Sequence, residues 1–147
     1  MELRKKTTMI VIHCAATKAS MDIGATEIKK WHVDDNGWDD IGYHYIIKRG
    51  GLVEVGRPEG FQGAHAPAAN SKSIGVCLIG GMADDGGAEN NFTLEQFLSL
   101  KDLIKRLKMT NPNIVEIVGH NDIQENKPNC PGFNLKEWLH KEDINVQ

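Results

Sequence analysis

Short apolar runs alternate with amphipathic segments along the chain, and their spacing predicts strands separated by helices. A strand is predicted over residues 41–48 from its β-branched and aromatic content. The turn at 49–51 and the apolar arm at 52–55 complete a hairpin with it. Three other runs are apolar at nearly every position, which is typical of strands covered on both faces of a sheet. They span residues 8–14, 73–79 and 114–118.

Amphipathic segments between these runs predict helices. Thr26 is expected to cap a helix over residues 27–35. A longer helix is expected after Thr93, because Gln96 stands where it completes a capping box. Asn134 is expected to cap a last short helix. The apolar positions of the longer helix form a broad stripe suited to core packing: Leu94, Phe97, Leu98, Leu100, Leu103, Ile104 and Leu107.

The order strand, helix, hairpin, strand, helix, strand, helix predicts an α/β fold of the mixed α+β kind. We expect a single domain with a central mixed β-sheet and helices packed on its faces. A length of 147 residues suits one domain. Residues 1–7 are predicted as a polar N-terminal tail and residues 8–147 as the folded domain. Residues 56–72 show no periodicity, and a loop of this length in a compact domain is usually functional.

Composition and charge narrow the possible partners and location. The net charge of −3 provides no basic field for nucleic acid, so no nucleic-acid partner is expected. The apolar run after the polar N-terminus is too short for a signal-peptide core or a membrane span. We therefore expect synthesis in the cytoplasm without export, no insertion into a membrane, and a monomer by default. Three cysteines are too few, and odd in number, for a disulfide framework.

The residues with the clearest chemistry stand at the ends of predicted strands. His13 ends the first strand, His120 follows the last one, and Cys130 lies in a turn rich in proline and glycine. Imidazole nitrogen and thiolate sulfur suit Zn²⁺, and three protein ligands with an open fourth position are typical of catalytic zinc. Parallel neighbouring strands would bring both histidines together. The sequence therefore predicts a zinc site of His13, His120 and Cys130, against the commoner case of a structural histidine or a buried thiol.

Side chains alternate between the two faces of a strand, which predicts the face taken by residues near the expected zinc ligands. Cys14 is expected to face the core, opposite His13, and Cys77 is likewise expected to be a buried free thiol. Either Tyr43 or His44 can reach the metal region, and the other is then structural. Two further histidines are open to a structural reading. His65 is the only imidazole of the 56–72 loop and contacts either substrate or its own loop. His32, beside Trp31, is expected to pack at a helix edge.

Several motifs, taken together and in order, resemble a known family. They are His13-Cys14-Ala15-Ala16-Thr17-Lys18, Gly42-Tyr43-His44-Tyr45-Ile46-Ile47, Gly63-Ala64-His65-Ala66, Ser73-Ile74-Gly75-Val76-Cys77, Gly119-His120 and Cys130-Pro131-Gly132. From about residue 8 to 139 the chain is similar to the zinc amidases related to peptidoglycan recognition proteins. Within that family it most resembles the phage-type N-acetylmuramoyl-L-alanine amidases of the phage lysozyme branch.

The resemblance implies roles for individual residues. It implies zinc at the positions of His13, His120 and Cys130, with a catalytic tyrosine at Tyr43 and a supporting residue at His44. The phage branch has a catalytic lysine two residues before the zinc cysteine. That position here is Pro128, and the lysine, Lys127, stands one residue earlier in a slightly longer loop. We expect Lys127 to take that role.

The resemblance also implies a reaction and a setting. The expected activity is zinc-dependent hydrolysis of the amide between N-acetylmuramic acid and L-alanine in bacterial peptidoglycan. The expected setting is a phage or prophage endolysin that reaches the wall after another protein permeabilises the membrane. Residues 56–72 are expected to form one wall of the groove for glycan and peptide. Two alternatives remain: a module that only binds peptidoglycan, and a structural zinc with Asp122 or His65 as fourth ligand.

Overall fold

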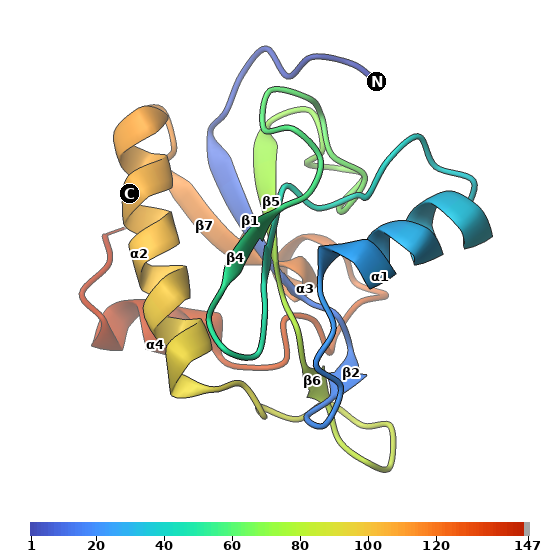
Figure 1. Cartoon of the computed structure of the whole chain (residues 1–147). Helices are drawn as coiled ribbons and strands as arrows, with labels where there is room; N and C mark the ends of the chain where they lie inside the picture. Colours follow the sequence, from blue (N-terminus) through green and yellow to red (C-terminus); the bar gives the residue numbers. More distant parts are fainter. Residues whose placement is uncertain (146–147) are drawn as a thin grey trace.

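A five-stranded sheet forms the centre of the computed structural model, which describes residues 1–145 (Figure 1). The last two residues of the predicted 8–147 domain lie outside this range. The strand order is β4-β3-β5-β1-β7; β4 is antiparallel to β3, and the remaining neighbours are parallel. The strands are β1 (Met9–Cys14), β3 (Tyr45–Ile47), β4 (Val53–Val55), β5 (Ser73–Leu78) and β7 (Glu116–Gly119). This confirms the predicted single domain with a central mixed sheet.

The register of the parallel strands places the two predicted histidine ligands at one edge. In the pairing of β1 with β7, Ile12 lies opposite Gly119. His13 is the next residue of β1, and His120 directly follows Gly119. Both imidazoles therefore leave the sheet at neighbouring carboxyl ends, as expected for parallel strands. His120 also begins a one-turn helix, α3 (His120–Ile123), which turns the chain away from the sheet.

Helices cover the two faces of the sheet (Figure 1). On one face lie α2 (Leu94–Thr110) and α4 (Leu135–Lys141). On the other lies α1 (Ala25–Lys30), which continues as a π-helical turn, η1 (Trp31–Asp35). A separate two-stranded parallel sheet joins β2 (Thr17–Lys18) to β6 (Gly81–Met82). Within residues 1–145, no helix combines the length and hydropathy needed to cross a bilayer.

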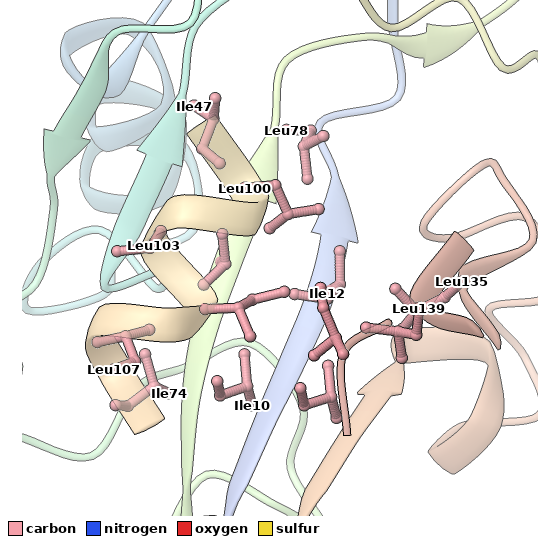
Figure 2. Close-up of a cluster of buried hydrophobic side chains, with 14 of the residues drawn as sticks. Ile10, Ile12, Ile47, Ile74, Leu78, Leu100, Leu103, Leu107, Leu135 and Leu139 are labelled. Atoms are coloured by element: carbon pink, nitrogen blue, oxygen red, sulfur yellow. The ribbon is translucent and has the colours of Figure 1, made fainter. Parts of the chain in front are cut away.

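The main hydrophobic core lies between the sheet and the α2–α4 layer (Figure 2). Alternate residues of β1, Ile10 and Ile12, point into this layer and are fully buried. They meet the seam of α2 formed by Leu100, Leu103 and Leu107. Each such side chain stabilises the fold by about 1.5–3 kcal/mol relative to an exposed one. The other residues of β1 face the opposite layer, so this core fixes which face His13 occupies.

The predicted stripe of α2 is too broad. Leu94 and Leu98 stand one turn apart and are 69% and 57% exposed. The buried side of the helix carries Gln96, Leu100, Leu103, Ile104 and Leu107, because the sheet contacts only that side. The predicted capping box is confirmed: Thr93 Oγ1 accepts from the Gln96 amide at 3.0 Å. The Gln96 side chain also donates to the carbonyls of Ile47 and Ile79, which ties α2 to two strand ends.

The predicted cap of α1 is wrong. The helix begins at Ala25, after Gly24, so Thr26 lies inside its first turn. Two carboxylates supply the acceptors that Thr26 was expected to provide. Glu27 accepts from the Gly24 amide at 2.7 Å and Glu54, from β4, accepts from the Ala25 amide at 2.8 Å. The second acceptor comes from a distant strand, which a local pattern does not reveal.

The N-terminal segment predicted as a polar tail is held against the 56–72 loop. The amide of Arg4 donates to the Gly60 carbonyl at 2.7 Å, and the amide of Gln62 donates to the Glu2 carbonyl at 2.8 Å. The Arg4 guanidinium also donates to the Phe61 carbonyl at 3.1 Å. Residues 2–4 thus extend the folded structure beyond the predicted boundary at residue 8.

His44 connects three segments from a fully buried position. Its Nδ1 accepts from the Gly75 amide at 2.9 Å, so its proton is on Nε2, which donates to the Phe61 carbonyl at 2.7 Å. Burial lowers the pKa of His44 to about 4. A neutral ring is needed for this pattern, because a protonated Nδ1 could not accept. His44 is therefore a support between β5 and the 56–72 loop.

We predict that His44 makes the metal-free protein sensitive to acid. Between pH 6.5 and 4 the unfolded chain binds a proton here and the native state does not, so the free energy of unfolding falls as the pH falls. His44 should contribute about 2 kcal/mol of the loss between pH 7 and pH 5. Urea unfolding of wild type and His44→Asn at both pH values measures this. An equal loss in both proteins would contradict it.

Candidate metal centre

Three side chains from distant parts of the chain meet at the carboxyl end of β1. His13 Nδ1 lies 3.1 Å from His120 Nδ1 and 3.9 Å from Cys130 Sγ. The ligand atoms of all three lie within 4.8 Å of one another. Both histidines are buried, and Cys130 is partly exposed. The structure thus brings together the three residues predicted as zinc ligands.

The loop that carries Cys130 is held against the two strand ends by backbone contacts. The Asn121 amide donates to the Cys130 carbonyl at 2.8 Å, which closes the loop after α3. The Cys14 amide, at the end of β1, donates to Cys130 Sγ at 3.3 Å. These contacts position the sulfur beside the two imidazoles, although Cys130 belongs to no strand or helix.

The spacing of the donor atoms fits a tetrahedral zinc ion. Zinc binds histidine nitrogen at about 2.0–2.1 Å and cysteine sulfur at about 2.3 Å. Tetrahedral angles then separate two nitrogens by about 3.3 Å, and a nitrogen from a sulfur by about 3.6 Å. The observed 3.1 Å and 3.9 Å lie close to these values. The donor set of two imidazoles and one thiol also matches the preference of zinc.

The histidines of the site are in the neutral state that a metal ion needs, whereas the thiol of Cys130 is protonated. Burial lowers the pKa of His13 well below its usual value and also lowers the pKa of His65 and His120, so these rings are neutral near pH 7. A neutral imidazole offers a lone pair to a metal. The interaction with the Cys14 side chain, together with burial, raises the pKa of the Cys130 thiol, and the hydrogen bond from the Cys14 amide acts in the opposite direction. A bound cation would have to displace the thiol proton.

Asp122, His65 and Cys14 all lie near the metal-binding group. Asp122 accepts from the Gly119 amide at 2.8 Å and so caps α3, and His65 contacts the far side of His13. Within residues 1–145, neither joins the metal-binding group. Cys14 is buried, as expected, and lies outside the metal-binding group, but it also lies beside Cys130 and borders a cleft. Alternation no longer separates the faces where β1 ends and the Cys130 loop crosses it.

Two clefts meet at the metal-binding group. The first, of about 370 Å³, lies between the ends of β1 and β6 and the Cys130 loop. The second, of about 470 Å³, lies between η1 and the 56–72 loop. Tyr43, His120 and Lys127 border both clefts. The remaining residues of the second cleft are His32, Trp38, Ala64, His65, Pro67, Asn70 and Gln124.

Tyr43 reaches the site, and His44 does not. The rings of Tyr43 and His13 have centroids 5.0 Å apart. The predicted strand over 41–48 is shorter than expected, since β3 begins at Tyr45, but the alternation still directs Tyr43 and His44 to opposite sides. Burial raises the pKa of the Tyr43 hydroxyl well above its usual value, and the neighbouring cysteines act in the same direction. The hydroxyl therefore remains a proton donor at neutral pH.

Lys127 lies on the exposed side of the site. It occupies a turn in which its amide donates to the Gln124 carbonyl at 3.1 Å and its carbonyl accepts from the Cys130 amide at 3.4 Å. It lines both clefts together with His120, and its positive charge contributes to lowering the pKa of His13 and His120. The turn explains how a lysine three residues before Cys130 still borders the site.

Hydrogen bonds and ring contacts position His32 and His65. His32 Nδ1 accepts from the Gly42 amide at 2.9 Å, and its ring lies 4.6 Å from that of Trp38. The expected packing position of His32 therefore lies at a wall of the second cleft. His65 is 7% exposed, and its Nδ1 lies 2.8 Å from His13 Nε2. Trp38, 38% exposed in the same cleft, was not predicted, because it stands in an irregular turn without periodicity.

Known proteins are similar to this chain over most of its length. The family model described as N-acetylmuramoyl-L-alanine amidase matches residues 3–133. The endolysin of Klebsiella phage KP32 is 43% identical over 96% of this chain and 91% of its own length. The endolysin of Escherichia phage T7 has the same identity and coverage. Peptidoglycan-recognition protein SC2 of Drosophila melanogaster is 34% identical over 85% of this chain and 68% of its own length.

Solved structures give the same assignment. The endolysin N-acetylmuramoyl-L-alanine amidase LysCS from Clostridium intestinale superposes with a TM-score of 0.80 and 29% identity. The match covers 99% of this chain and 88% of that one. The family model spans both histidines of the metal-binding group, Cys130 and Tyr43. The chain belongs to the N-acetylmuramoyl-L-alanine amidase family.

Proposed function

We propose that this protein hydrolyses the amide between N-acetylmuramic acid and L-alanine in bacterial peptidoglycan, with zinc held by His13, His120 and Cys130. One observation carries the proposal: the metal-binding group lies where two clefts meet. A module that only binds its target has no need of three ligand atoms at zinc spacing beside a protonated tyrosine. Family membership supports the amidase reaction.

The two clefts suit a branched substrate. The scissile amide of peptidoglycan joins a glycan strand to a stem peptide, so an enzyme for this bond must accommodate two chains that diverge from one point. Here Tyr43 and Lys127 border both clefts, and His120 faces the junction. Ala64, Pro67 and Asn70 form part of one wall, in line with the expectation that the 56–72 loop borders the groove.

The chain's own groups supply the remaining steps of the proposed mechanism. When bound, zinc would lower the pKa of a coordinated water from 15.7 to about 7 and polarise the amide carbonyl. The Tyr43 hydroxyl would donate a hydrogen bond to the oxygen that becomes negative as the carbonyl is attacked. The Lys127 ammonium would stabilise the same charge from the solvent side. Burial of His13 and His120 keeps both rings neutral and available as ligands.

The proposed setting follows from the relatives. The proteins from Klebsiella phage KP32 and Escherichia phage T7 are named endolysins. We infer that this protein is likewise a phage or prophage endolysin that acts on peptidoglycan as a monomer. It would be made in the cytoplasm and would reach the wall once the membrane is permeabilised.

We predict that purified peptidoglycan treated with the protein gains free L-alanine amino termini and no new reducing sugar ends. A chelator should abolish the reaction, and added zinc should restore it, because the ligand group has to be loaded. Amino-terminal labelling and a reducing-end assay on the same digest measure both products. Binding to the wall without new termini would favour a recognition module, and new reducing ends would place the cleaved bond in the glycan.

Ligand variants provide the control for the metal. Cys130→Ser should lose zinc on dialysis and lose activity with it, since a thiolate ligand is removed. Cys14→Ser is the matched control, because Cys14 lies beside Cys130 but outside the metal-binding group, and it should retain one zinc per chain. Elemental analysis gives the stoichiometry. Full zinc content in Cys130→Ser would rule out the ligand assignment.

Tyr43→Phe should retain zinc and lower kcat by about 10²–10³-fold, because a donor to the developing negative charge is removed. Tyr45→Phe is the matched control: the Tyr45 hydroxyl donates to Glu59 at 2.5 Å and does not border either of the two clefts. Turnover and zinc content of both variants separate catalysis from metal binding. Wild-type turnover in Tyr43→Phe would remove this residue from the mechanism.

Lys127→Ala should lower kcat by about tenfold, which corresponds to about 1.4 kcal/mol of transition-state stabilisation by one exposed charge. The smaller effect is expected because solvent screens an exposed ammonium. Lys136→Ala, an exposed lysine on α4, is the control for a change in net charge. If both variants turn over substrate at the wild-type rate, Lys127 takes no part in the reaction.

A further inference from the structure

A line of hydrogen-bonding groups leads away from the metal-binding group into the protein. His13 Nε2, on the side opposite its ligand atom, lies 2.8 Å from His65 Nδ1. His65 Nε2 lies 3.2 Å from Ser73 Oγ, and Ser73 Oγ lies 2.7 Å from the Ala69 carbonyl oxygen. All three side chains are buried, and Ser73 is completely inaccessible. No solvent therefore contacts Ser73, and the donors and acceptors along this line are set by the protein alone.

The end of this line determines where each proton lies. A carbonyl oxygen only accepts, so the Ser73 hydroxyl donates to Ala69. Ser73 Oγ must then accept its other hydrogen bond, which places a proton on His65 Nε2. A neutral His65 with its proton on Nε2 has an acceptor at Nδ1, and this acceptor faces His13 Nε2. His13 consequently carries its own proton on Nε2 and leaves Nδ1 free, toward His120 and Cys130.

The surrounding chain is built to hold the His65 ring in this position. A Cβ atom on Gly75 would lie 2.7 Å from His65 ring atoms, and one on Gly63 would lie 2.5 Å from His65 Cδ2. The ring thus occupies space that only glycine leaves open on both sides. The side chain of Asn70 accepts from the amides of His65 and Ala66 at 3.0 Å and 2.9 Å, which fixes the backbone.

We propose that His65 is a positioning residue that holds His13 in the tautomer and orientation needed for zinc binding, through the line from Ser73 to His13. This inference rests on His13 being a zinc ligand, as proposed above. Of the two roles left open for His65, a substrate contact and a structural one, it favours the structural role, since the Nδ1 atom of that ring is directed at His13. A partner of this kind behind a metal-binding histidine typically changes metal affinity by 10–100-fold.

The acceptor at His65 Nδ1 is the atom on which the position of His13 depends. Asparagine in place of His65 would carry its side-chain oxygen near the position of Nδ1, whereas leucine would place no acceptor there. His65→Leu should therefore raise the zinc dissociation constant by 10–100-fold, and His65→Asn should keep it within about threefold of wild type. Competition with a chromophoric zinc chelator at pH 7 measures all three constants, and circular dichroism checks that each variant is folded.

Each result bears on the proposal. An unchanged constant in His65→Leu overturns it, and so does a His65→Asn variant that binds zinc as weakly as His65→Leu. A wild-type protein that binds zinc tightly but leaves peptidoglycan intact would contradict the proposed function and leave this inference standing. If the wild-type protein cleaves peptidoglycan but His65→Leu binds zinc as tightly as wild type, the proposed function stands and the role of His65 is contradicted.

A measurement on the wild-type protein keeps the test independent of any variant. Correlation spectra of the imidazole nitrogens of the metal-free protein should show His13 and His65 neutral, each with its proton on Nε2. A proton on Nδ1 of either ring would overturn the proposal. Ser73→Ala should convert His65 into a mixture of tautomers and weaken zinc binding less than His65→Leu does, because the acceptor that orients His65 is lost while the ring remains.

Discussion

The parallel pairing of β1 with β7 is the constraint on which the site depends. It places Ile12 opposite Gly119, so His13 and His120 leave the sheet side by side. A shift of one residue would turn His13 to the α2 side of the sheet and an apolar residue to the metal side. The buried isoleucines of β1 prevent such a shift, because it would expose them to the wrong layer. The hydrophobic core therefore sets the geometry of the polar site.

The three proposed ligands differ in how they are supported. His13 belongs to a central strand, and His120 begins a short helix capped by Asp122. Cys130 lies in a loop that is held to α3 by a backbone hydrogen bond and to β1 by the bond from the Cys14 amide to the Cys130 sulfur. Behind His13, the 56–72 loop adds a further layer, and residues 2–4 and His44 hold that loop in place. The loop thus serves the site from two sides: Ala64 and Pro67 border a cleft, and His65 contacts a proposed ligand.

Sequence reasoning located the strand-end residues and missed what depends on distant contacts. The proximity of His13 and His120 could be predicted because parallel strand ends meet at one edge, and Cys130 was added to them because its thiol suits the same metal. Alternation permits either Tyr43 or His44 to reach the metal region; the family resemblance implied Tyr43, and the ring of Tyr43 lies beside that of His13 in the structure. The cap of α1 could not be predicted, since one of its acceptors, Glu54, comes from another strand. The contact of His65 with His13 depends on how a long irregular loop closes, and no local periodicity encodes that.

The wide separation of the proposed ligands along the chain has a consequence for loading and stability. His13 and His120 are 107 positions apart, and Cys130 is 117 positions from His13. An ion bound by all three would close a loop that contains most of the protein. Chain-entropy arguments for a covalent cross-link of such length give about 4–5 kcal/mol, taken from the unfolded state. The complete ligand set also exists only after residue 130 has been synthesised, so full coordination would follow the translation of the whole segment from His13 to Cys130.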